Sequence, residues 1–103
     1  MAKFSAIGVI ETFGLVYALQ AADAMEKAAN VELMGYENVA SGYISVLVTG
    51  DIAACQSAVD AGVNAVTSMG GNLHSSLVIA NPHPDMYKIL DRYRLENLLP
   101  KAE

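Results

Sequence analysis

The chain has little that would anchor it in a membrane, cross-link it or hold a metal. Its longest apolar runs are broken by Gly, Ser, Asp or Glu well before the ~20 residues of a membrane span, and no basic-then-apolar leader opens it. Cys55 is the single cysteine, so no internal disulfide can form, and two histidines without a second thiol make a poor zinc set. We therefore expect a soluble cytoplasmic protein that uses no membrane, metal or disulfide.

Positive charge is scarce as well. The net charge is -5, and Lys27 is the only Lys or Arg between Phe4 and Pro84. A surface that tracks phosphates needs clustered Lys and Arg, so the sequence predicts no nucleic-acid partner. The eight glycines never form a phosphate-cradling motif with a following lysine, and we expect no nucleotide or other cofactor.

A nucleophile paired with a base is also missing. Cys55 lies on the apolar side of a predicted helix, where a desolvated thiol is unreactive. His83 stands between two prolines, and His74 is alone on a predicted strand. Three carboxylates at predicted strand ends or turns have cap and turn roles that need no substrate: Glu11, Glu37 and Asp51. The sequence predicts that the protein is not an enzyme.

Apolar residues, in contrast, are abundant for a chain of this size. Of 103 residues, 53% are hydrophobic and 17% are charged. A domain this short buries a modest share of its surface when it folds alone. We therefore expect the chain to associate with itself.

The periodicity predicts an α/β (α+β) domain with the element order βαββαβ. Strands are expected over four segments: Phe4–Thr12, Val31–Tyr36, Tyr43–Thr49 and Leu73–Ala80. Helices are expected from Gly14 to about Asn30, and from an N-cap at Asp51 to a stop at Gly70 and Gly71. The middle strands should pair as a hairpin across the loop from Glu37 to Gly42.

Each predicted helix has an apolar stripe and a polar face. The stripe of the first is Leu15, Ala18, Ala22, Met25 and Ala29, opposite Gln20, Asp23, Lys27 and Asn30. The stripe of the second is Ile52, Cys55, Val59, Gly62, Val66 and Met69, opposite Ser57, Asp60, Asn64 and Thr67. After Pro84 the mixed charges predict a short helix or two, so we divide the chain into a domain at 1–84 and a helical tail at 85–103.

Six ordered stretches carry a resemblance to a known family. They are GVIETFGL at 8–15, AADAMEKAANV at 21–31, GYENVASG at 35–42, VTGD at 48–51, DAGVNAV at 60–66 and VIANPHPD at 78–85. Together they resemble the hexameric shell proteins of bacterial microcompartments. The resemblance implies a ferredoxin-like βαββαβ BMC domain that assembles as a cyclic homohexamer. It further implies a flat tile with a central pore for small polar metabolites.

The resemblance also implies two sets of site residues. The pore loop corresponds to Asn38, Val39, Ala40, Ser41 and Gly42, and the edge between hexamers corresponds to Lys27, Asn30 and Asn81. Lysine is usual in the family where this chain has Asn38, and arginine is usual where it has Asn81 and Thr49. We therefore expect an uncharged pore that passes neutral or weakly anionic metabolites, and tiling that depends on Lys27.

The implied partners are further copies of the chain, other shell proteins, and encapsulated enzymes or their targeting peptides, within a shell in the cytoplasm. Both catabolic compartments and carboxysomes share these motifs. A ferredoxin-like regulatory module that binds a small ligand is the alternative, because it uses the same element order. Such a module requires a ligand cleft with converging polar groups, whereas a shell subunit requires its small-residue loop on a ring axis.

Overall fold

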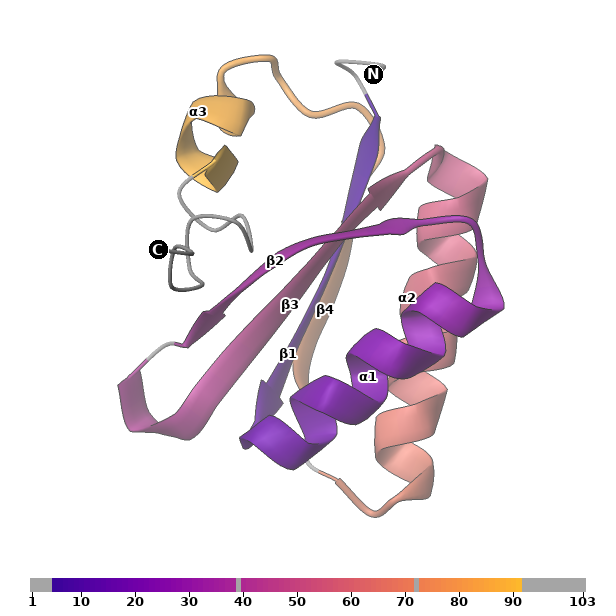
Figure 1. Cartoon of the computed structure of the whole chain (residues 1–103), viewed down its shortest axis with the longest axis vertical. Coiled ribbons are helices and arrows are strands. Elements are labelled where there is room, and N and C mark those ends of the chain that lie inside the picture. The colour runs from indigo at the N-terminus through magenta and orange to yellow at the C-terminus, as the bar shows by residue number, and fades with distance from the viewer. Residues whose placement is uncertain (1–4, 39, 72, 92–103) are drawn as a thin grey trace, which may run out of the picture.

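The computed structural model describes residues 5–38, 40–71 and 73–91 and has the predicted order of elements, followed by one short helix. The elements are β1 (Ala6–Phe13), α1 (Leu15–Ala28), β2 (Glu32–Asn38), a 3₁₀ turn η1 (Ala40–Gly42), β3 (Tyr43–Gly50), α2 (Ile52–Ser68), β4 (Leu73–Ile79) and α3 (Met86–Leu90). The four strands form one antiparallel sheet in the order β2-β3-β1-β4 (Figure 1). The fold class predicted from the sequence is confirmed.

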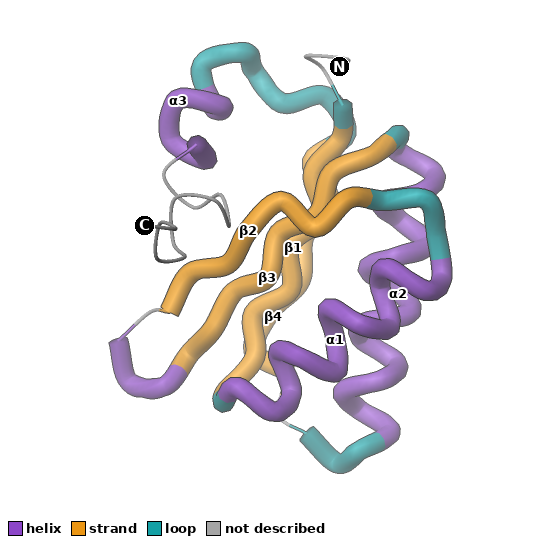
Figure 2. Tube along the Cα trace, in the orientation of Figure 1, coloured by secondary structure: helices purple, strands orange, loops and turns teal. Residues whose placement is uncertain are grey.

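Helices α1 and α2 lie side by side on one face of this sheet (Figure 2). Their buried side chains pack on the inward-facing residues of the strands, and the centre of this core is Ile10, Met25, Val48 and Val66, all fully buried. The predicted polar faces of both helices are exposed. The predicted apolar stripes need correction at their ends, because Leu15 and Ile52 are more than half exposed while Ala21 is buried.

The ends of α2 follow from local chemistry that the sequence contains. The Asp51 carboxylate accepts a hydrogen bond from the Ala54 amide at 2.8 Å, which satisfies one of the free donors at the helix start. Gly70 has a positive φ of 74°, and the Gly71 amide donates to the Val66 carbonyl at 2.9 Å, which ends the helix. Inside the helix, Gly62 is buried in close contact with its neighbours. Only glycine fits there, because a Cβ would meet Ile10 Cδ1 and would lie 2.9 Å from Met25 Cγ.

Helix α3 covers part of the sheet face opposite α1 and α2. Leu90 is buried there against Ile7 and Leu47, and the Tyr87 hydroxyl donates to the Ser5 carbonyl at 3.0 Å. This small second core lies at the end of the sheet where β1 begins. The predicted domain division at residue 84 stays a prediction, and residues 92–103 of the predicted tail lie outside the described residues.

Candidate functional site: the loop end and the rim end of the sheet

The antiparallel register separates the two sets of predicted site residues. Phe13 pairs with Tyr43 at one end of the sheet, where β2 finishes at Asn38, and Ala6 pairs with Gly50 at the other. The turn η1 therefore lies at one end, which we call the loop end. Asn30 precedes β2 and Asn81 follows β4, so both lie at the opposite end, which we call the rim end.

At the loop end the chain turns through two successive left-handed residues. Ser41 has φ 71° and ψ 20°, and Gly42 has φ 87°. Glycine adopts this region without cost, whereas the serine pays for it with steric strain. Asn38, Ser41 and Gly42 are exposed. Val39, which belongs to the predicted pore lining, lies outside the described residues.

The loop is held against the end of β1. The Gly14 amide donates to the Gly42 carbonyl at 2.9 Å, and the Phe13 ring lies over Gly42 so closely that a Cβ there would be 3.3 Å from Phe13 Cε1. Phe13 and Tyr43 also pack edge to face, with ring centroids 5.3 Å apart and an interplanar angle of 71°. These contacts fix the position of the turn relative to the sheet.

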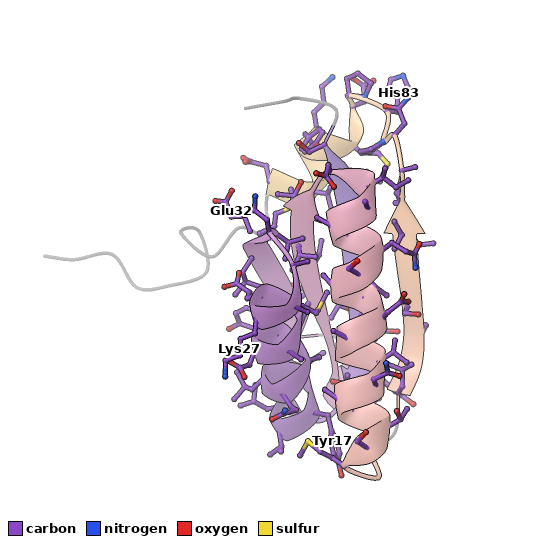
Figure 3. The ribbon with its side chains drawn as sticks, turned by 90° about the vertical axis from the view of Figure 1, so that its right-hand side faces the viewer. Tyr17, Lys27, Glu32 and His83 are labelled. Atoms are coloured by element: carbon purple, nitrogen blue, oxygen red, sulfur yellow. The ribbon has the colours of Figure 1, made fainter. Side chains whose placement is uncertain are left out.

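At the rim end, Asn30 and Asn81 are exposed. Lys27 lies one turn before Asn30 on the outer face of α1, and its ammonium lies 2.9 Å from the Asp23 carboxylate. Figure 3 shows Lys27 projecting from the molecule on one side, with His83 on the other. Because the Lys27 side chain is 76% exposed, this ion pair contributes little to stability and leaves the ammonium accessible.

One lateral edge of the domain carries an apolar groove. The groove lies between α1 and strands β2 and β3 and has a volume of about 260 Å³. It is lined by Leu15, Ala18, Leu19, Ala22, Leu33, Tyr36, Ile44 and Val46. Leu15 and Leu19 are 56% and 61% exposed, which is unusual for leucines that are neighbours on one helix. The groove therefore presents exposed apolar side chains at this edge of the domain.

The other lateral edge is formed by β4 and α2. A hollow of about 610 Å³ lies between them, lined by Gln56, Val59, Asp60, Val63, Asn64, Ser76, Leu77 and Val78. Leu77 is 55% exposed at the middle of this edge strand. Because the strand order places β2 and β4 at opposite edges of the sheet, the groove and Leu77 lie on opposite sides of the domain.

Two of the candidate catalytic side chains, Cys55 and His83, lie among the described residues. Cys55 is fully buried, and this burial, followed by the nearby Asp51 carboxylate, raises the pKa of its thiol, so the thiolate is disfavoured. The exposed His83 accepts a hydrogen bond from the Asp85 amide at Nδ1. Within the described ranges no three His, Cys, Asp or Glu side chains converge on a common point. No helix in that part of the chain is long and apolar enough to cross a membrane.

Glu11 lies near the end of β1, as the sequence predicted, but its partners were not predicted. It lies on the face of the sheet opposite α1 and α2, beside Ser45 of β3 and Ser75 of β4. Its carboxylate accepts hydrogen bonds from the two serine hydroxyls at 3.1 and 3.4 Å. The serines are 34 and 64 residues away in sequence, so only the strand register reveals the cluster.

Comparison with known proteins agrees with this architecture. The chain is 47% identical over 87 residues to the bacterial microcompartment shell protein PduA of Citrobacter freundii. The aligned residues cover 84% of this chain and 92% of that protein. It is 45% identical over 97 residues to the major carboxysome shell protein CsoS1A of Halothiobacillus neapolitanus. The aligned residues cover 94% of this chain and 90% of that protein.

A solved structure of a microcompartments protein from Desulfitobacterium hafniense superposes with a TM-score of 0.75 at 33% identity. The match covers 82% of this chain, which spans about half (48%) of that protein's chain. The model of the BMC domain family matches residues 6–82, from the start of β1 to Pro82 beyond β4. The chain therefore belongs to the BMC domain family.

Proposed function

We propose that the chain is a structural subunit of a bacterial microcompartment shell, which closes into a ring of six and tiles the shell wall. The observation that carries this proposal is the separation of a small-residue loop at one end of the sheet from exposed polar residues at the other, in a member of the BMC domain family. The loop end faces the ring axis, and the rim end faces neighbouring rings. Other shell proteins and the encapsulated enzymes are its further partners, inside a cytoplasmic shell.

The two different lateral edges suit a head-to-tail contact between subunits. An apolar groove lies on one edge and an exposed Leu77 on the opposite edge, so the β4 edge of each subunit docks on the groove of the next. Such a contact forms a ring where the rotation closes, which we propose here for six copies, whereas a two-fold contact uses the same patch twice. The occupant of the groove is therefore a second copy of this chain.

The turn at Ala40–Gly42 is proposed to line the central pore, together with Asn38 and Val39. Six symmetric copies of a loop approach an axis closely only where side chains are small. Ser41 has a left-handed backbone that a glycine would adopt freely, and strained residues of this kind cluster at functional sites. Six Ser41 hydroxyls would replace part of the hydration of a small polar metabolite.

Cysteine cross-linking tests this placement. Ser41→Cys is expected to give a ladder of linked species up to the hexamer with a short bifunctional maleimide, because six thiols would surround one axis. Ser57→Cys, on the exposed face of α2, is the matched control and should give far less linkage. Buried Cys55 contributes little background. Equal ladders from both variants would remove Ser41 from the axis.

Tiling is proposed to depend on Lys27, Asn30 and Asn81. The aliphatic stem of Lys27 can lie along a neighbouring ring while its three N–H donors reach carbonyl oxygens. Asp23 holds this ammonium at the helix surface and leaves it largely in solvent before contact. Asn81 is uncharged and lacks the planar fork of donors with which an arginine crosses an interface.

We expect Lys27→Ala to abolish the two-dimensional sheets or tubes that the rings form, and Asn81→Arg to strengthen them. Electron microscopy of both variants beside the unchanged chain measures this effect. Gln20→Ala, which removes another exposed polar side chain from α1, is the control. Sheets that survive in Lys27→Ala and do not increase in Asn81→Arg would leave both residues without this role.

The alternatives lack comparable support. A small-ligand regulatory module would use a polar cleft, and in the hollow beside β4 two of the polar side chains bond to each other, since Gln56 donates to Asp60 at 3.3 Å. An enzyme would need a reactive group, and the buried Cys55 is kept as a neutral thiol. We therefore infer a wall-and-pore role without catalysis.

A further inference from the structure

The carboxylate of Glu26 makes a bond that its own helix does not require. Glu26 is exposed in the last turn of α1, and its Oε1 accepts a hydrogen bond from the Leu33 amide of β2 at 2.7 Å. This distance is typical of charge-assisted N–H···O⁻ bonds, which are the stronger ones. An acidic side chain in the last turn faces the negative end of the helix dipole, so local helix preference disfavours it. The bond to Leu33 explains the position better than the helix does.

This bond encloses two of the residues proposed for tiling. Its ends are seven residues apart in sequence, and Lys27 and Asn30 both lie between them, where α1 ends and β2 begins. Figure 3 shows Lys27 and Glu32, near the two ends of this stretch, projecting on the same side of the molecule. Fixing both ends of so short a stretch reduces the conformations that its backbone can adopt.

The strand ladder holds this stretch only in part. The pairing of β2 with β3 shifts register between Leu33 and Gly35, so the regular ladder is interrupted just after the first residues of β2. The connection before β2 packs against the end of β3, where a Cβ at Gly50 would lie 3.1 Å from the Asn30 carbonyl oxygen. The Glu26 bond therefore ties the start of β2 to α1 at a place where the ladder is irregular.

We propose that Glu26 is a positioning residue for the tiling edge. Its bond to the Leu33 amide holds the end of α1 against the start of β2 and so presents Lys27 and Asn30 to the neighbouring ring. A long lysine side chain loses conformational entropy when it is ordered at an interface, and a fixed backbone reduces that cost. The inference rests on the proposed function, because it assumes the tiling role of Lys27 and Asn30.

Two substitutions separate the bond from the charge. Glu26→Ala removes the acceptor, whereas Glu26→Gln keeps an acceptor oxygen without the charge. In Glu26→Ala we expect hydrogen exchange of the Leu33 amide, measured by NMR, to become at least about tenfold faster, because a bond to a charged group is lost. Two-dimensional sheets, seen by electron microscopy, should then require about three- to tenfold more protein. Glu26→Gln should recover most of both effects, and native mass spectrometry should show intact rings throughout.

Glu32→Ala is the control, because it removes an exposed carboxylate next to Leu33 and keeps the Glu26 bond. It should assemble like the unchanged chain. Unchanged exchange in Glu26→Ala would contradict the bond. Sheets that form at the usual concentration despite faster exchange, or an equal loss in Glu32→Ala, would overturn the positioning role. If Lys27→Ala also forms sheets normally, the tiling edge itself is wrong; if Lys27→Ala abolishes them, the error concerns Glu26 alone.

Discussion

Replacing Leu19 by aspartate is expected to dismantle the ring into single chains. Leu19 is exposed in the groove between α1 and β2, where we place the neighbouring subunit. A carboxylate buried there without a partner costs about 2–4 kcal/mol per contact, or about a hundredfold in association. Native mass spectrometry measures the change. Gln20→Asp adds the same charge on the polar face of α1 and should leave the ring intact.

Leu77→Asp should have the same effect through the opposite edge. Each of the two variants keeps one intact edge, so an equal mixture should form dimers of one Leu19→Asp chain with one Leu77→Asp chain and nothing larger. A two-fold contact would give no such rescue. Single chains in the mixture, or rings in either variant alone, would contradict the head-to-tail arrangement.

Ile10→Ala is expected to lower the free energy of unfolding by about 2–5 kcal/mol, because the truncation leaves a cavity that the packed surroundings fill only in part. Ile10 is fully buried between the sheet and the helices, and its Cδ1 occupies the space beside Gly62. Urea unfolding at one fixed protein concentration measures the change, since ring dissociation contributes to it.

Ile89→Ala removes the same atoms from a side chain that is 61% exposed on α3 and should change the free energy of unfolding by less than about 0.5 kcal/mol. A similar effect from both variants would mean that Ile10 does not occupy the core as described.

Local chemistry made the order and type of the elements predictable. The polar face of α1, with Gln20, Asp23 and Lys27, is set by a period that any amphipathic helix shows. The start of α2 at Asp51 and its end at Gly70 depend on hydrogen bonds within a few residues of each terminus. The hairpin of β2 and β3 is local in the same sense.

Contacts between distant segments were not predictable in this way. Glu11 meets Ser45 and Ser75 only through the pairing of three strands. Leu15 was assigned to the apolar stripe because it fits the period, yet it is 56% exposed and lines the groove. An exposed apolar residue in a groove fits the same period as a core residue, so periodicity alone does not distinguish them.

The burial of Leu90 is a further example. The sequence predicted a short helix outside the domain after Pro84, and α3 does form there. Its contact with Ile7 and Leu47, on the sheet face opposite α1 and α2, depends on how the chain returns across the sheet. Apolar residues in a segment of mixed charge do not indicate which face they will cover.

The mass of the native particle tests the central claim most directly. One chain has a mass of 10.9 kDa, so a ring of six has a mass of about 65 kDa, six times that value. We predict this species in native mass spectrometry across micromolar concentrations. A particle that stays at the mass of one or two chains over that range would contradict the ring, and with it the wall-and-pore function.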